Sequence, residues 1–226
     1  MYEALESTLG VHFRNPALLT LALTHRSYIY ETPGEGQSSN ERLEFLGDSI
    51  LALISADYLY RAFPRLSEGE LTDVRAVLVR TETLADFARD ISLGTFLLMG
   101  KGEQHSGGGK RVLASAFEAL LGAIYLDQGL AEVQAFLLPR LEPLAQTIIE
   151  KRLFKDNKSL FQELAQAHDG ITPLYRLVSQ EGPSHNREFT IEVLVGESIA
   201  GRGQGRNKQT AEQEAARSAL LNRGWI

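Results

Sequence analysis

The spacing of apolar residues changes near residue 155, and this change limits the possible folds of the chain more than any other feature. Before that point, apolar residues recur every three or four positions, as in amphipathic helices, and no run alternates convincingly. After it, one segment has apolar residues at every second position: Phe189, Ile191, Val193 and Val195. Such alternation is typical of a half-buried strand. The sequence therefore predicts an all-α domain followed by a small α+β domain.

The expected helices of the first part are separated by segments rich in glycine and proline, such as 32–36 and 107–109. They cover residues 16–28, 41–63, 70–91, 111–126 and 130–149. The polar segment 151–157 has no apolar periodicity and is expected to be a linker. The expected domains are therefore residues 1–150 and 158–226.

The second domain is expected to fold in the order α-β-β-β-α. Ser159 and Gln162 fit a capping box that opens a helix ending near residue 168. Strands are expected at 173–179, 187–195 and 198–203, with a tight turn between the last two. Asn207 is a suitable cap for the last helix, which carries a stripe of small and apolar residues.

Composition excludes several classes of protein. No stretch approaches the roughly 18 apolar residues of a membrane span, and the first residues lack the basic flank and apolar run of a signal peptide. We therefore expect a cytoplasmic protein with no membrane partner. The absence of cysteine excludes disulfides and zinc–thiolate sites, so any metal must be held by oxygen or imidazole. A net charge of −6 argues against a nucleic-acid partner unless basic residues cluster locally.

Acidic residues share one face of the helix expected at 41–63. At about 100° per residue, Glu41, Glu44 and Asp48 fall within about 60° of one another, opposite an apolar face. Phe45 and Leu53 extend the apolar surface around the helix, which indicates that the carboxylates are not fully exposed. Like charges so close together need a cation or a proton. Oxygen ligands favour Mg²⁺ or Mn²⁺ over zinc. The alternative is a solvated acidic face that pairs with a base such as Arg42.

A further carboxylate, Glu118, is the lone charge in an otherwise apolar stretch of the helix expected at 111–126. Burial of an unpaired carboxylate would drive it to the neutral form, so Glu118 is expected to be either paired internally or a metal ligand. Beside Glu44 and Asp48, it would complete a site for one or two Mg²⁺ ions. Asp127 lies half a turn away around the helix and is expected to be a helix-end or turn residue.

These motifs resemble those of the ribonuclease III family. Residues 40–49, NERLEFLGDS, are similar to the family signature, and residues 156–226 resemble a double-stranded-RNA-binding domain. Further matches follow in the family's order at residues 24–28, 63–64, 68–71, 78–79 and 107–127. The resemblance implies an all-α endonuclease domain, a linker and an RNA-binding domain, with the boundaries given above.

The family's chemistry is Mg²⁺-dependent hydrolysis of double-stranded RNA, with Mn²⁺ as a possible substitute. The resemblance implies a homodimer formed through the nuclease domain, each subunit cutting one strand to leave staggered ends with 5′-phosphates. It implies substrates such as structured precursor RNAs, those of ribosomal RNA included. By the same resemblance, Glu44, Asp48 and Glu118 are metal-ligand and catalytic positions. Glu41 and Glu68 match acidic positions that line the cleavage site.

One position departs from the family's pattern. The family usually has Ala-Asp-x-Phe-Glu-Ala, whereas this chain has Ser115 at the aspartate position, one turn before Glu118. Serine at this metal-ligand position removes one negative charge, and a neutral hydroxyl is a poor replacement for an anionic ligand. We expect a lower metal affinity or rate. Three explanations stay open: a natural variant with retained activity, an inactivated natural paralogue, or an engineered substitution. Retained or weakened activity is favoured because the other carboxylates are all present.

The resemblance also implies the residues that bind RNA. They lie in the first helix of the second domain, in its first inter-strand loop and at the start of its last helix: Gln162, Glu163, His185, Arg206, Asn207, Lys208 and Gln209. Contacts from these regions read the shape of an A-form duplex rather than its sequence. Gln209 replaces the second of the family's paired lysines. Arg202 and Arg206 could compensate as parts of a local basic cluster.

Two other functions stay open at the level of sequence. One is a catalytically silent double-stranded-RNA binder whose first domain serves dimerisation, which Ser115 alone supports. The other is a metal-stabilised helix bundle without RNA chemistry. A cleavage assay with Mg²⁺ and a long duplex separates the nuclease from both.

Overall fold

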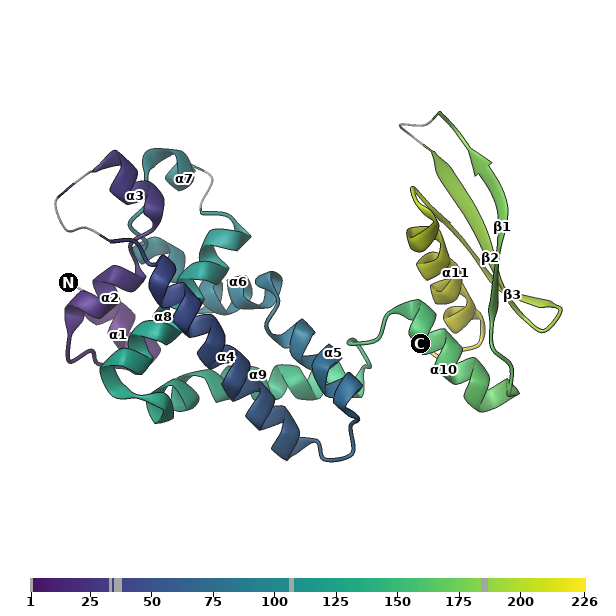
Figure 1. Cartoon of the computed structure of the whole chain (residues 1–226), viewed down its shortest axis with the longest axis horizontal. Helices are drawn as coiled ribbons and strands as arrows, with labels where there is room; N and C mark the ends of the chain where they lie inside the picture. The colour runs from purple at the N-terminus through teal and green to yellow at the C-terminus, as the bar shows by residue number, and fades with distance from the viewer. Residues whose placement is uncertain (1, 33, 35–37, 106–107, 184–186) are drawn as a thin grey trace. The chain divides into compact units, whose positions relative to one another are not determined.

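Every regular element described in the first part of the chain is a helix, as its periodicity predicts. The computed structural model describes residues 2–32, 34, 38–105, 108–183 and 187–226 and divides into two units, Met1–Phe154 and Lys155–Ile226. The first unit contains the following helices (Figure 1): α1 Glu3–Leu9, α2 Pro16–Ala22, α3 Arg26–Glu31, α4 Glu41–Ala62, α5 Glu68–Leu78, α6 Thr81–Asp90, the 3-10 helix η1 Leu93–Phe96, α7 Lys101–His105, α8 Lys110–Gln128 and α9 Leu130–Glu150. Among the described residues, no helix is long and apolar enough to cross a bilayer.

Two of the expected helices are each interrupted. The helix expected at 16–28 is α2 and α3, because residues 23–25 leave helical geometry to pair with the segment after η1. There, Leu98 N donates to Leu23 O at 2.8 Å, and His25 N donates to Leu98 O at 2.9 Å. The helix expected at 70–91 is α5 and α6, separated by the extended backbone of Arg80. Apolar spacing continues across the second break because α5 and α6 pack on the same core, whereas no residue of α3 is buried.

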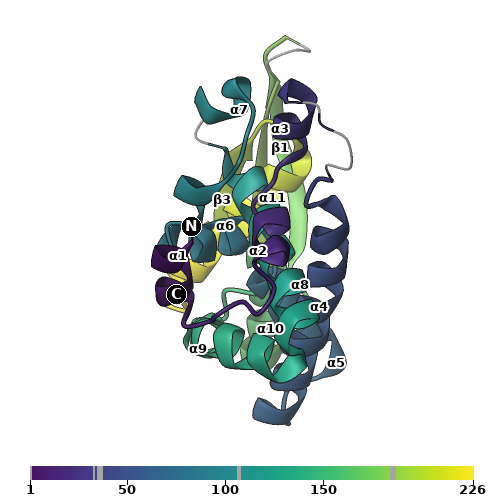
Figure 2. The same cartoon turned by 90° about the vertical axis from the view of Figure 1, so that its left-hand side faces the viewer.

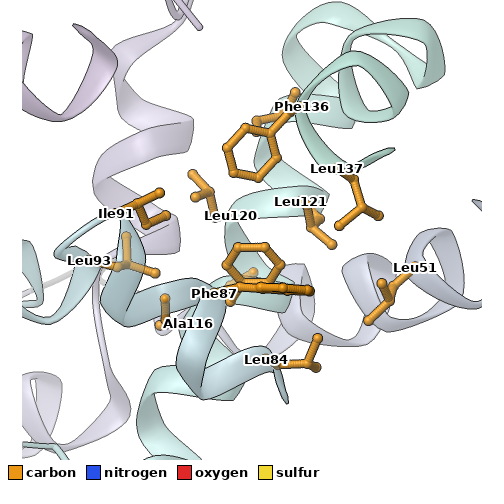
Figure 3. Packing of buried hydrophobic residues seen from close by; sticks show 14 of the residues in the cluster. Leu51, Leu84, Phe87, Ile91, Leu93, Ala116, Leu120, Leu121, Phe136 and Leu137 are labelled. Atoms are coloured by element: carbon orange, nitrogen blue, oxygen red, sulfur yellow. The ribbon is translucent and has the colours of Figure 1, made fainter. Parts of the chain in front are cut away.

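The core of the first unit is built around α8. The rings of Phe87 and Phe117 lie 5.8 Å apart, and those of Phe117 and Phe136 lie 5.9 Å apart. Figure 3 shows Phe87 and Phe136 with other members of the same buried cluster from α4, α6, α8 and α9, including Leu51, Leu120 and Leu121. Almost every residue from Leu113 to Ile124 is buried. Because α8 is surrounded, a polar residue on it either lines a site or destabilises the core.

The second unit has the expected α-β-β-β-α order. Its elements are α10 Asn157–Asp169, β1 Leu174–Glu181, β2 Glu188–Val195, β3 Ser198–Gly205 and α11 Lys208–Asn222. The strands form one antiparallel sheet in the order β1-β2-β3. Gly201 and Gly203 of β3 meet the alanine stripe of α11, where a Cβ on Gly203 would lie 2.1 Å from Ala215 N. The helix and sheet backbones are therefore in direct contact.

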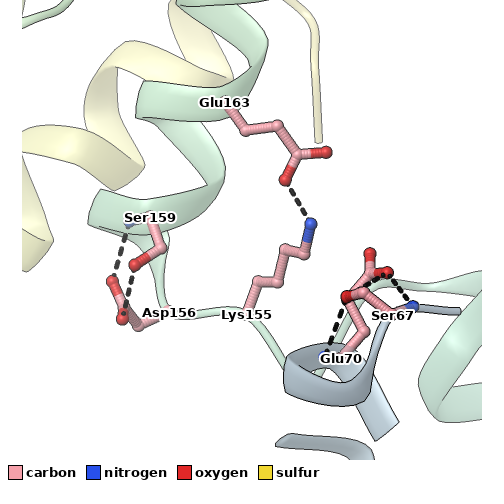
Figure 4. A network of polar contacts seen from close by, with 6 residues as sticks. All are labelled: Ser67, Glu70, Lys155, Asp156, Ser159 and Glu163. Atoms are coloured by element: carbon pink, nitrogen blue, oxygen red, sulfur yellow. Dashed lines mark hydrogen bonds and ion pairs between the residues drawn. The ribbon is translucent and has the colours of Figure 1, made fainter.

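Helix caps account for two differences between expected and observed helix starts. Ser67 and Glu70 form a capping box, so α5 begins at Glu68 rather than at residue 70 (Figure 4). The capping box expected at Ser159 is wrong, because Asp156 caps α10 by accepting from Ser159 N at 2.9 Å. Ser159 Oγ donates to the same carboxylate at 3.0 Å. The expected cap at Asn207 is confirmed, since its Oδ1 accepts from Thr210 N at 2.8 Å.

Candidate active site and RNA-binding surface

Two glycines bring the acidic faces of α4 and α8 together. Figures 1 and 2 both show these helices side by side. A Cβ on Gly47 would lie 1.7 Å from Glu118 O, and a Cβ on Gly122 would lie 2.4 Å from Leu43 O. The two backbones therefore touch where neither helix carries a side chain. This contact places Glu118 beside the stretch of α4 that carries Glu44 and Asp48.

The electrostatics of Glu118 reflect this convergence. Glu118 is half-buried, and its pKa is raised to about 7, first by burial and then by repulsion from Asp48 and Glu44. The three carboxylates predicted to share a site are thus electrostatic neighbours. Among the described residues, however, no group of three His, Cys, Asp or Glu side chains is arranged so that it could hold a metal ion. The chemistry of the oxygen donors themselves suits Mg²⁺ or Mn²⁺.

Ser115 lies at the same site. Its Oγ donates a hydrogen bond to Glu44 Oε1 at 2.8 Å, linking α8 to α4. Ser115 is half-buried, like Glu44 and Glu118. Ser115 therefore lies beside the carboxylates, as expected. It contributes a neutral hydroxyl that orients Glu44 and adds no negative charge to the site.

Exposure along α4 differs from the expectation. Asp48 and Glu41 are exposed, and Phe45 and Leu53 do not cover the acidic face but point to solvent, with 78% and 56% of their surface exposed. The expectation that apolar residues enclose this helix is therefore wrong, since α4 lies on the surface of the unit and keeps an unpartnered apolar face. Of Glu41, Glu44 and Asp48, Glu44 is the half-buried carboxylate.

Of the remaining acidic positions, Glu41 lines the same cleft as Glu44, whereas Glu68 lies apart from it. Glu41 pairs with Arg26, Oε1 to Nη1 at 3.6 Å, and not with Arg42. Glu68 begins α5 and lines a small hollow that also includes Tyr60. Tyr60 is 16 residues after Glu44 on α4, which corresponds to about 24 Å along the helix axis. One chain alone therefore does not bring Glu68 to Glu44.

Asp127 does not belong to the site. Its carboxylate accepts hydrogen bonds from Arg14 N and Asn15 N, both at 2.8 Å. It therefore closes the last turn of α8 against the loop before α2, which confirms its expected helix-end role.

A polar cleft of about 490 Å³ opens beside Glu44 and Ser115. It is lined by residues of α3, α4, α7 and α8 and of the segments before them: His25, Arg26, Asn40, Glu41, Glu44, Glu103, Gly109, Arg111, Val112 and Ser115. Figures 1 and 2 place α3 and α7 at the same end of the unit. Sequence reasoning did not assign Arg26 or Arg111 to the site. Arg111 could have been found from its position four residues before Ser115, on the same face of α8.

The expected RNA-binding residues of the second unit are exposed where the structure describes them. Gln162 and Glu163 lie on the surface of α10, and Glu163 pairs with Lys155 (Figure 4). The start of α11 is also exposed: Arg206, Asn207, Lys208 and Gln209. The N–H groups of this helix start and the two cations are suited to phosphate. His185 lies outside the described residues.

A helical unit with converging carboxylates, joined to an α-β-β-β-α domain that exposes a basic helix start, defines a class of nuclease that acts on RNA duplexes. Comparisons with known proteins agree. Residues 15–144 match the model of a family described as Ribonuclease-III-like, and residues 157–223 match that of the double-stranded RNA binding motif.

Curated relatives cover almost the whole chain. Ribonuclease 3 of Pelotomaculum thermopropionicum is 48% identical over 219 residues, which is 96% of this chain and 91% of that protein. Ribonuclease 3 of Oceanobacillus iheyensis is 47% identical over 218 residues, 96% and 95% of the two chains. A solved nuclease domain of ribonuclease III from Campylobacter jejuni has a TM-score of 0.58 and 36% identity, and covers 63% of this chain and 97% of that one. The chain belongs to the ribonuclease III family and is a double-stranded-RNA endoribonuclease.

Proposed function

We propose that this chain hydrolyses double-stranded RNA with Mg²⁺, or Mn²⁺ in its place, held by Glu44, Asp48 and Glu118. The observation that carries the proposal is the glycine-packed crossing of α4 and α8, which places Glu118 beside Asp48 and Glu44, where burial and their charges raise its pKa to about 7. A protein gathers such carboxylates at a cost to stability, which a divalent cation offsets. When bound, the ion supplies Lewis acidity and an activated water for attack on phosphorus.

The chain's own residues orient this site and hold its substrate. Ser115 fixes Glu44 through its hydrogen bond, and the Arg26–Glu41 pair forms one wall of the cleft. The second unit holds the duplex through α10 and the start of α11. We propose cleavage products with staggered ends and 5′-phosphates, and structured precursor transcripts, including those of ribosomal RNA, as substrates.

The exposed apolar face of α4 supports a homodimer through the nuclease unit. Phe45, Leu53 and Tyr60 recur at seven or eight positions along one face, with 78%, 56% and 74% of their surface exposed. Large apolar side chains exposed along one helix face mark an interaction surface. An antiparallel pairing of two α4 helices centred on Ala52 would place Tyr60 of the partner subunit opposite Glu44. Glu68 of the partner subunit then lies near that site, which would give Glu68 its expected role.

The dimer is tested by substituting one residue of this stripe. We expect Phe45→Asp to convert a dimer to a monomer in size-exclusion chromatography with light scattering, because a charge cannot be buried at an apolar seam. Tyr30→Asp is the matched control, since Tyr30 is 81% exposed and lies on α3 away from the stripe. A wild-type monomer at micromolar concentration, or an unchanged Phe45→Asp dimer, would contradict the proposal.

Ser115 supports an alternative, a weakened or silent enzyme that binds duplex RNA. We expect the purified chain to cut a long duplex in Mg²⁺, and Ser115→Asp to lower the half-saturating Mg²⁺ concentration by about tenfold, because it adds an anionic ligand. Titration of initial cleavage rates against Mg²⁺ measures this shift. Absence of cutting at every metal concentration favours the silent binder, and an unchanged titration shows that position 115 is dispensable.

A further inference from the structure

The cleft beside the carboxylates contains one arginine that no described residue engages. Arg111 is exposed on the first turn of α8 and lines the cleft. Among the described residues, its guanidinium makes no hydrogen bond or ion pair, whereas the other cleft arginine, Arg26, lies 3.6 Å from Glu41. The cleft therefore holds a cation that contacts within the described part of the chain do not neutralise.

Arg111 is aligned with the residues of the proposed metal site. Residues four apart on a helix are neighbours, with about 5–6 Å between their Cβ atoms, so Arg111 projects beside Ser115. Glu118 follows Arg111 by seven residues, which is about 10 Å along the helix axis. A guanidinium at this distance reaches a neighbouring part of the RNA strand and not the phosphate at Glu118.

The charges of the cleft explain why a free cation is useful there. Its lining has two arginines against three carboxylates, Glu41, Glu44 and Glu103. A phosphodiester entering this cleft is repelled by the carboxylates until it meets a cation. Arginine binds phosphate oxygens through two parallel N–H donors, which fixes orientation as well as position.

We propose that Arg111 binds the RNA phosphate next to the one that is cleaved and so aligns the strand across Glu44, Ser115 and Glu118. This inference rests on the proposed function. Ser115 and Arg111 together make this cleft less acidic than an aspartate and a neutral residue would. The chain thereby strengthens its hold on the substrate strand at a site that has one carboxylate fewer than its family's pattern.

Steady-state cleavage of a duplex in saturating Mg²⁺ tests the inference. We expect Arg111→Ala to raise KM about tenfold or more with kcat within about twofold, because the lost contact is to a phosphate that does not react. Arg111→Lys should recover part of the loss, since lysine keeps the charge but not the paired donors. Lys110→Ala is the matched control, because Lys110 is the exposed neighbour on α8 that does not line the cleft.

A binding measurement gives a second readout. In a Glu118→Gln background, the slope of log affinity against log salt should be shallower by about 0.9 with Arg111→Ala, as for the loss of one phosphate contact. Wild-type cleavage with an unchanged KM in Arg111→Ala, or an equal effect of Lys110→Ala, overturns the role of Arg111 and leaves the proposed function intact. Failure of the wild-type chain to cut duplex RNA refutes the proposed function itself. An unchanged melting temperature in each variant shows that the fold is retained.

Discussion

Glu118→Gln is expected to reduce turnover by about a thousandfold or more while duplex binding survives. The amide keeps the shape of the side chain but cannot provide an anionic oxygen to Mg²⁺, whose charge stabilisation is worth several kcal/mol. Duplex binding depends mainly on the second unit, which this substitution does not touch. Initial cleavage rates and a gel-shift titration with the same duplex measure the two effects. Loss of both would show that Glu118 has a structural role.

The same substitution is expected to stabilise the metal-free protein. The pKa of Glu118 rises from 4.5 to about 7 on folding, so the folded state binds more protons than the unfolded state between these values. Stability therefore falls as pH rises through that window, and the cost is fully present above pH 7. The substituted amide carries no such charge. In EDTA, the melting temperature of Glu118→Gln should exceed that of the wild type at pH 8, with a smaller difference at pH 5. If Glu118→Gln and the wild type had equal melting temperatures at both pH values, folding would not raise the pKa of Glu118.

Gly47→Ala is expected to destabilise the nuclease unit by about 3 kcal/mol or more. The new Cβ would lie 1.7 Å from Glu118 O, so the backbone of α8 must move away from α4. The higher helix propensity of alanine, about 1 kcal/mol, has the opposite sign but is too small to compensate. Cleavage should fall as well, because Glu118 moves with α8. Urea unfolding followed by circular dichroism measures the change.

Gly69→Ala is the matched control for this substitution. Gly69 lies within α5, and a Cβ there meets nothing within 4 Å. Helix propensity alone then acts, so the free energy of unfolding should stay unchanged or rise slightly. If Gly47→Ala were as stable as Gly69→Ala, the close contact between α4 and α8 would be refuted.

Much of the fold could be predicted because it depends on local patterns. Alternation at Phe189–Val195 identifies β2, and the side chain of Asn207 sets the start of α11. The breaks between α2 and α3 and between α5 and α6 could not be predicted, since the apolar spacing runs through them. At the start of α10, the carboxylate of Asp156 accepts from Ser159 N, the amide that Gln162 would have bonded in the expected capping box.

The carboxylates of the candidate site could be predicted from the sequence. The close contact between the two helices that carry them could not. Helical spacing places Glu44 and Asp48 on one face, and the lone charge of α8 identifies Glu118. The close approach of α4 and α8 at Gly47 and Gly122 depends on tertiary packing. A glycine within a helix does not by itself reveal such a contact. The exposure of Phe45 depends on whether another element covers α4, and helical periodicity carries no information on that.

A crystal of the full chain soaked with Mn²⁺ tests the central claim most directly, through anomalous scattering at the manganese edge. We expect a peak bounded by carboxylate oxygens of Glu44, Asp48 and Glu118. The absence of such a peak at saturating Mn²⁺, with these carboxylates turned to solvent or paired with arginines, would contradict it.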